Sequence, residues 1–182
     1  DDDFAQLASE FDTLAELEVD LRRRLEAVKK LQQGVQARDK VLESLLSRVE
    51  VPLPDRLVEA QVADHFDDGH GDEEHKAEFE KQAREALTAQ FVLDAIAAKE
   101  ELSVGEGELS EYIVRNASRY GMTPDDFADQ IVASGQIPAV IGEVVRAKAL
   151  AQVLQAATVT DESGNPVDLE ALRNDQVLSQ PA

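Results

Sequence analysis

Three histidines within one short segment are the side chains in this sequence best suited to hold a metal ion. His65, His70 and His75 occur in the segment HFDDGHGDEEH, with Asp67, Asp68 and Asp72 between them. Imidazole and carboxylate groups together can ligate zinc or nickel. A spacing of five does not place the three rings on one face of a helix, and the two glycines in the segment indicate a mobile loop. Such a loop lacks groups that orient metal ligands, so the sequence predicts a solvated connection and no metal site.

No other set of residues forms a recognisable catalytic arrangement. The chain has 38 acidic residues, so neighbouring carboxylates such as Asp125 and Asp126 are expected from abundance alone. A working acid–base pair also needs a pocket that separates two pKa values, and no motif points to one. The serines lack a nucleophile elbow, no glycine-rich phosphate loop is present, and there is no cysteine. We therefore expect no enzyme, no cofactor and no nucleotide site.

The composition narrows the range of partners. The formal net charge of −20 repels phosphate backbones, which argues against nucleic acid as a partner. No apolar run approaches the ~18 residues that a membrane-spanning helix needs, so no membrane partner is expected. Absence of cysteine fits a reducing compartment, and we expect a cytoplasmic protein. With 43% hydrophobic residues but only 4% aromatic ones, the core must consist of Leu, Val and Ala.

The first part of the chain, residues 1–50, predicts a long helix. Thr13 and Glu16 form a capping-box pattern, and apolar residues then recur in steps of three and four up to Val49. A continuous helix from Thr13 to Val49 would be ~55 Å long, so part of it must project from any globule. A bend is expected near Gly34. The apolar seam either packs on the rest of the protein or pairs two chains as a weak homodimer, and interruptions at Gly34 and Arg38 favour packing on the body.

Two helical arms are expected to follow. The patterns at 54–67 and 73–100 predict an antiparallel helical hairpin, the first arm, over residues 54–102. Residues 105–157 predict a second arm of three short helices. Residues 158–173 would return to the body, and residues 174–182 would form a flexible tail. The predicted fold class is thus all-α: an elongated helical domain with a long helix, a body and two projecting arms.

The residues that start and stop the helices of the second arm are the clearest local signal in the sequence. Gly121 can adopt the left-handed conformation that ends a helix, and Thr123 then caps the next one, with Pro124 at its first position. Helices this short are not stable alone, so they must bury apolar faces against each other or against a ligand. Helical spacing is mainly a core signal, but Met122 and Phe127, which flank a helix start, are expected to be exposed. The candidate binding residues are Tyr112, Ile113, Tyr120, Met122, Phe127, Ile131, Ile137, Val140, Ile141 and Val144.

Several motifs, in this order and spacing, resemble the C-terminal domain of trigger factor, over most of the chain. They are Phe11 to Leu17, the Val51 to Pro54 break, Arg84 with Leu93-Asp94-Ala95-Ile96, Glu106 to Leu109, Tyr120-Gly121-Met122, and Ala157 to Thr160 with Gly164.

The resemblance implies a function as well as a fold. That family has a ribosome-docking domain, a prolyl isomerase domain, and a helical body whose two arms form a cradle. Only the body and the arms are similar to this sequence. The resemblance therefore implies an ATP-independent chaperone piece that binds unfolded or nascent polypeptides, and that meets the ribosome only through a domain missing here. Two alternatives stay open: the helical body of a parvulin-associated periplasmic folding factor, and a structural dimerisation module.

Overall fold

The computed structural model describes residues 2–167 and residue 169, and in this part of the chain the regular elements are all helices. Within the described residues, an isolated bridge joins Thr160 to Pro166. The predicted tail, residues 174–182, lies outside the described residues, as does most of 168–173. The elements are α1 (Asp2–Ala8), α2 (Leu14–Leu46), α3 (Asp55–His65), α4 (Glu73–Lys99), α5 (Glu106–Ala117), the 3₁₀ turn η1 (Ser118–Tyr120), α6 (Pro124–Ala133) and α7 (Ile137–Ala156).

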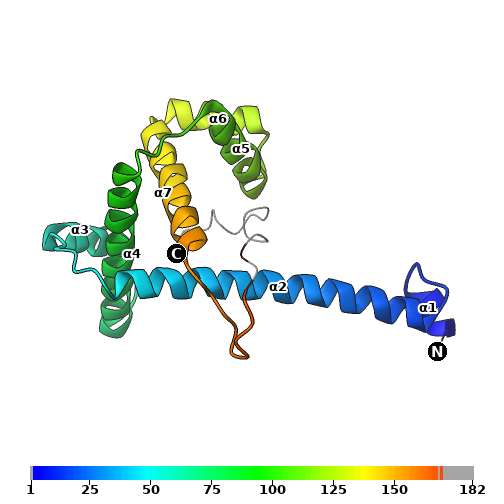
Figure 1. Ribbon diagram of the computed structural model, residues 1–182. Coiled ribbons are helices and arrows are strands. Elements are labelled where there is room, and N and C mark those ends of the chain that lie inside the picture. Colours follow the sequence, from blue (N-terminus) through cyan, green and yellow to red (C-terminus); the bar gives the residue numbers. More distant parts are fainter. Residues whose placement is uncertain (1, 168, 170–182) are drawn as a thin grey trace.

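A short helix that was not predicted precedes the predicted long one. α1 is a short separate helix, and the Asp2 carboxylate accepts a hydrogen bond from the Leu14 N–H at 2.8 Å where α2 begins. α2 starts with the predicted capping box of Thr13 and Glu16 and runs without interruption through Gly34, over 33 residues or about 50 Å. In Figure 1 α2 extends far beyond the other helices, with α1 at its distant end. This is the predicted projection.

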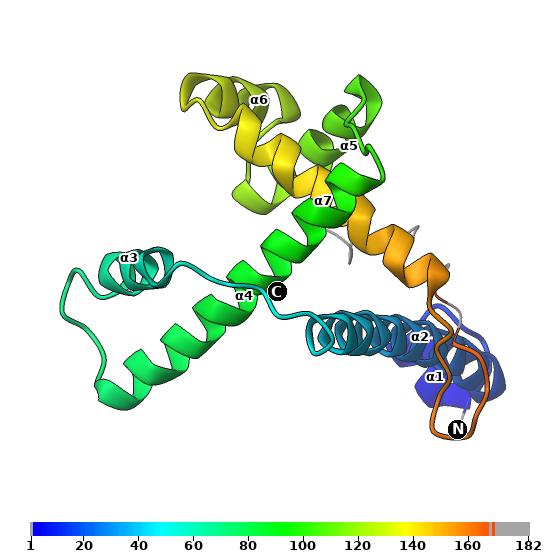
Figure 2. The same cartoon turned by 60° about the vertical axis from the view of Figure 1, so that its left-hand side comes forward.

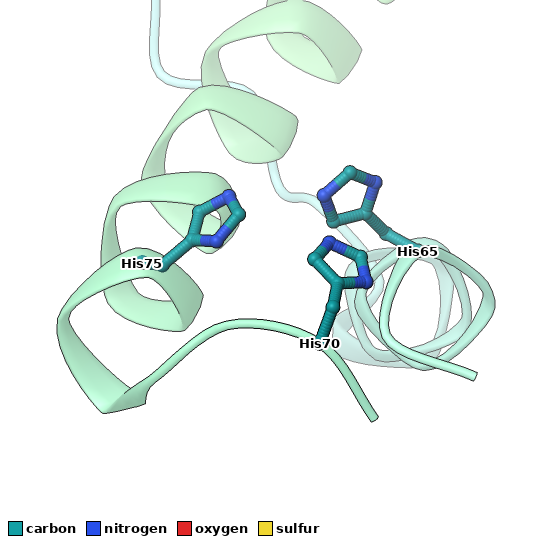
Figure 3. Close-up of side chains that lie close together, drawn as sticks. All are labelled: His65, His70 and His75. Carbon is teal, nitrogen blue, oxygen red and sulfur yellow. The ribbon is translucent and has the colours of Figure 1, made fainter. Parts of the chain in front are cut away.

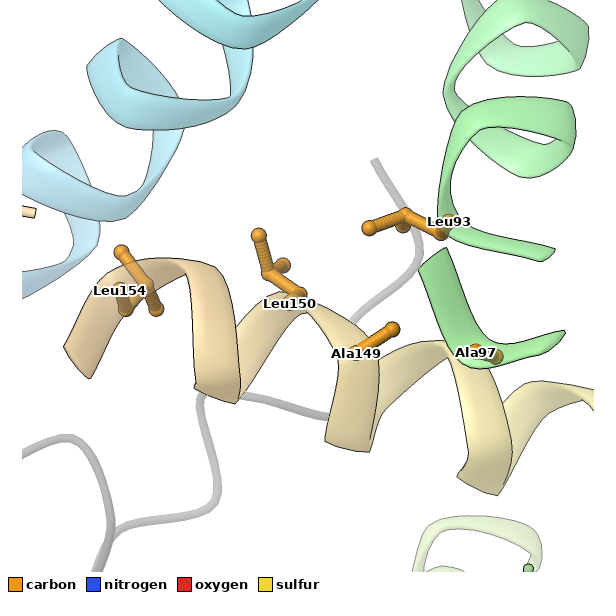
Figure 4. Close-up of a cluster of buried hydrophobic side chains, with 5 residues drawn as sticks. All are labelled: Leu93, Ala97, Ala149, Leu150 and Leu154. Carbon is orange, nitrogen blue, oxygen red and sulfur yellow. The ribbon is translucent and has the colours of Figure 1, made fainter. Parts of the chain in front are cut away.

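The body forms where α4 and α7 pack against each other. Its buried cluster combines Leu93 and Ala97 of α4 with Ala149, Leu150 and Leu154 of α7 (Figure 4). Val41 and Leu42, near the end of α2, pack against the same cluster, so this end of the long helix joins the body. An ion pair between Arg146 and Asp94 (3.2 Å) also connects the two helices. Burying each leucine here stabilises the fold by roughly 1.5–3 kcal/mol.

The apolar seam of α2 is covered over only part of its length. Leu21, Leu25 and Val28 are 48%, 62% and 50% exposed, in contrast to Val41 and Leu42. The seam is therefore packed on the body at its end, as expected, but is exposed from Leu21 to Val28, where the expectation is wrong. The basic residues beside it do pair with acids: Arg23 and Arg24 both contact the buried carboxylate of Asp20, at 2.6 and 2.5 Å.

The first arm is the predicted hairpin. α3 lies along α4 through a small cluster of Val58, Ala83 and Leu87, which Phe79 and Val62 extend towards the connecting loop. Figure 2 shows the two helices joined by this loop at the end away from α7. The hairpin therefore ends in the histidine-rich segment.

The second arm differs from its prediction in one respect. α5 and α6 are short, with 12 and 10 residues, but α7 has 20 because it serves both the arm and the body. Gly121 has φ +65° and Gly135 has φ +68°, so both helix stops use the left-handed conformation that glycine permits. Figure 1 places α6 beside the start of α7, the end away from the body cluster.

No helix among residues 2–167 is long and apolar enough to cross a membrane.

Candidate functional site

The second arm has a filled core of its own. Ala117 of α5, Phe127 and Ile131 of α6 and Val140 of α7 are all buried, between 1% and 9% exposed. Three of these four were among the ten predicted binding residues. Their side chains hold the three helices together, so they are not available on the surface of this structure.

Phe127 corrects a specific expectation. It was predicted to be exposed beside the helix start, but only 9% of it is exposed, and Met122 is half-buried against the same cluster. The reason lies in the cap. Thr123 Oγ1 accepts from the Asp126 N–H at 3.2 Å, which makes Met122 the residue before the cap and Phe127 the fourth residue of the helix. Apolar residues at these two positions pack together as a hydrophobic staple.

Tyr112, Ile113 and Val144 are half-buried. The Tyr112 hydroxyl donates to the Glu143 carboxylate at 2.8 Å, which joins α5 to α7. Burial, followed by this hydrogen bond, raises the pKa of Tyr112 well above its usual range. The phenol therefore stays protonated and acts as a structural link within the arm.

The remaining three candidates, Tyr120, Ile137 and Ile141, are exposed. Tyr120 is 68% exposed and stacks on the buried Phe127, with ring centroids 5.2 Å apart and planes at 18°. Ile137 and Ile141 are 38% and 39% exposed and lie one turn apart on the same side of α7. Each exposes apolar surface that the fold of the arm does not cover.

Two further exposed apolar residues were missed. Val114 on α5 and Val132 on α6 are 60% and 61% exposed. Both fall outside the helical repeat of their buried neighbours: Val132 follows Ile131 directly, and Val114 follows Ile113. An apolar residue out of phase with its stripe was the available signal. Together, Val114, Tyr120, Val132, Ile137 and Ile141 are called the exposed arm residues below.

Polar contacts fix the arm to the body helix. Lys148 on α7 donates to the Ser103 carbonyl at 2.6 Å and pairs with Glu108 at 2.7 Å. Glu108 also accepts from the Gly105 N–H at 2.8 Å, closing the start of α5. The Gly105 N–H, and then Lys148, hold the pKa of Glu108 below its usual range. The exposed arm residues therefore lie on helices that these polar contacts hold in place.

The three histidines also lie close together. The argument from their spacing considered a single helix and did not consider that a hairpin could bring them together. They belong to different segments: the end of α3, the loop, and the first turn of α4. The hairpin brings their rings to one place (Figure 3), with one nitrogen of each within 4.8 Å of the others.

Comparison with known proteins identifies the family. Residues 13–155 match the family described as bacterial trigger factor protein (TF) C-terminus. The chain belongs to the bacterial trigger factor family. The match lies in the C-terminal region of that family, and it sets aside the parvulin-associated alternative.

Individual relatives agree. The chain is 55% identical over 174 residues to trigger factor of Kineococcus radiotolerans, which covers 94% of this chain and 37% of that protein. Trigger factor of Renibacterium salmoninarum is 51% identical over 176 residues, covering 93% and 37%. The chain therefore spans little more than a third of the length of these relatives.

A solved structure supports the fold. A study of the domains of trigger factor from Thermotoga maritima contains a chain that aligns with a TM-score of 0.57 and 21% identity. The alignment covers 80% of this chain and 96% of that one. The all-α, elongated architecture is thus the trigger factor C-terminal fold.

Proposed function

We propose that this chain is a binding module for unfolded or nascent polypeptides, which it holds by their apolar segments without ATP and so delays their aggregation. The observation that carries the proposal is the pairing of a filled arm core with five exposed apolar side chains. Because Phe127, Ile131 and Val140 already stabilise the arm, the exposed arm residues are not needed to hold it together. Exposed apolar surface on a stable frame is typical of a protein interaction site.

The mode of binding follows from the chemistry of these side chains. Aliphatic groups and one tyrosine ring make few directional contacts, so they accept many different sequences. Single contacts of this kind are weak, and several patches on one chain raise the effective affinity. The acidic surface, with net charge −20, keeps a protein with exposed apolar groups soluble. We place this activity in the cytoplasm. Proline isomerisation and direct ribosome docking would belong to regions of the family outside this chain.

An aggregation assay tests the proposal. The chain is mixed at near-stoichiometric ratio with an unrelated, chemically unfolded protein, and light scattering is followed after dilution. We expect the double variant Val132→Glu with Ile141→Glu to need several-fold more protein for the same delay. Glutamate at both positions removes apolar contact area from α6 and α7.

A matched control separates the apolar contacts from the added charge. Gln130→Glu with Gln152→Glu places the same two charges on exposed positions of the same helices. This control is expected to protect as well as the parent chain. The proposal fails if the parent chain does not delay aggregation, or if the two double variants lose protection equally.

A further inference from the structure

The tip of the first arm contains three histidine side chains that lie close together. His65 is the last residue of α3, His70 lies in the loop, and His75 is in the first turn of α4. One ring nitrogen from each lies within 4.8 Å of the other two. Figure 3 shows the three rings turned towards a common space between the helices. These are the only three histidines in the sequence, and it contains no cysteine.

Two phenylalanines hold the rings in place. The His65 ring stacks on Phe79 with a centroid separation of 3.9 Å and an interplanar angle of 6°. Phe66 lies 5.0 Å from the His70 ring and 5.1 Å from the His75 ring. These contacts restrict the rotation of all three imidazoles, which lowers the entropy lost when they bind a common ligand.

The backbone of the loop passes close to the histidine cluster at Gly71. Gly71 has φ +81°, and a Cβ atom at this position would come within 2.7 Å of His75 Nδ1 and 2.9 Å of Phe66 Cε1. Asp72 caps α4 by accepting from the His75 N–H at 2.9 Å. A glycine is therefore required where the loop passes the rings, and the cap sets the direction of His75.

The Asp68 carboxylate orients the His70 ring. Asp68 contacts His70 Nδ1, and it also accepts from the His70 backbone N–H at 3.1 Å. With Nδ1–H donating to this carboxylate, Nε2 keeps its lone pair for a ligand. Carboxylate-oriented histidines are the usual arrangement around protein-bound zinc. This is the orienting group that the sequence argument took to be missing.

We propose that His65, His70 and His75 bind one zinc ion, which clips α3 to α4 at the tip of the first arm. Aromatic packing explains Phe66 and Phe79, but it does not account for three imidazoles with nitrogens in mutual reach and a carboxylate behind one of them. Zinc takes histidine nitrogens at about 2.0–2.1 Å. The rings must therefore approach by roughly an ångström, which the two-glycine loop permits. Water would complete the coordination.

Calorimetric titration of the chain with zinc chloride, after removal of any affinity tag, tests the proposal. We expect one zinc per chain. The triple variant His65→Ala, His70→Ala, His75→Ala should bind at least 100-fold more weakly, and Asp68→Ala about tenfold more weakly. A control, Asp64→Ala with Asp67→Ala, removes two exposed acids, one directly before the histidine segment and one within it, and should leave the affinity unchanged. Equal affinity of parent and triple variant would overturn the proposal, because carboxylates alone would then hold the metal.

A second measurement does not depend on how the variants fold. Long-range ¹H–¹⁵N spectra of the parent chain report each imidazole nitrogen, and three histidines give three sets of signals. One equivalent of zinc is expected to shift one nitrogen of all three rings, while calcium at the same concentration shifts none, because calcium prefers oxygen ligands. If zinc leaves any of the three rings unshifted, the three-histidine site is wrong.

Discussion

At the scale of single residues, the apolar side chains of the second arm are either buried or exposed, depending on which face of their helix they occupy. Phe127 and Tyr120 show the difference most directly, because their rings stack on each other although one is buried and the other is 68% exposed. Phe127 fills the space between α5, α6 and α7, whereas Tyr120 covers it from outside. Removing the two rings should therefore have different consequences.

We expect Phe127→Ala to lower the free energy of unfolding by about 3–5 kcal/mol, since it leaves a cavity in a small core. Tyr120→Ala should cost about 1 kcal/mol or less, the contribution of an aromatic pair, yet weaken protection in the aggregation assay. Urea denaturation followed by circular dichroism measures both changes. Similar losses of stability in the two variants would contradict the assignment of Tyr120 to the surface.

At the scale of elements, polar contacts join the second arm to the body helix α7, and one of them is the ion pair between Glu108 and Lys148. The Glu108 carboxylate closes the start of α5 through Gly105 and reaches α7 through Lys148. Because its folded pKa lies below the ordinary 4.5, the charged form is favoured in the folded state. The stabilisation is thus present above pH 4.5 and is lost as the pH falls through the lowered pKa.

We therefore expect Glu108→Gln to lower the melting temperature at neutral pH, and this difference from the parent to shrink as the pH falls below 4.5 through the lowered pKa of Glu108, because both side chains then become uncharged. The measurement is thermal unfolding of the parent and the variant across this pH range. Glu111→Gln, an exposed acid on the same helix, serves as the control. A pH-independent difference between Glu108→Gln and the parent would show that the contact with Lys148 does not depend on charge.

The elements also show how far the sequence could predict the fold. The cap at Thr123, the stop at Gly121 and the capping box at Thr13 were predicted and are confirmed, because each depends on hydrogen bonds within a few residues. The exposure of Phe127 was predicted wrongly, because burial depends on the packing of α5 and α7, which no local pattern specifies. The short helix α1 was not predicted; it contacts the start of α2 through the hydrogen bond from the Leu14 N–H to Asp2.

At the scale of the whole molecule, the protein is an open arrangement and not a closed bundle. α2 reaches well past the body, and the two arms leave the body in different directions (Figures 1 and 2). A compact domain of this length would have a radius of gyration of about 16 Å. The open shape leaves apolar surface available on the arms and along the middle of α2.

Small-angle X-ray scattering should therefore give a radius of gyration clearly above about 16 Å. A concentration series in the same experiment tests the weak homodimer, which stays a prediction. Pairing through the exposed seam would raise the apparent mass with concentration, and Leu21→Glu with Leu25→Glu would abolish the rise. A radius close to the compact value would contradict the open shape.

The sequence by itself determined the helix starts at Thr13 and Thr123, the stop at Gly121 and the amphipathic character of the helices, since caps, glycine stops and helical repeats act over a few residues. Its motifs also sufficed to indicate the family. Only the tertiary structure decided which apolar residues remain exposed and that three histidines five residues apart meet at one point. Both outcomes depend on how helices distant in sequence pack, because a neighbouring helix covers one side chain and leaves the next in water, and a hairpin brings together groups that no single helix face could align.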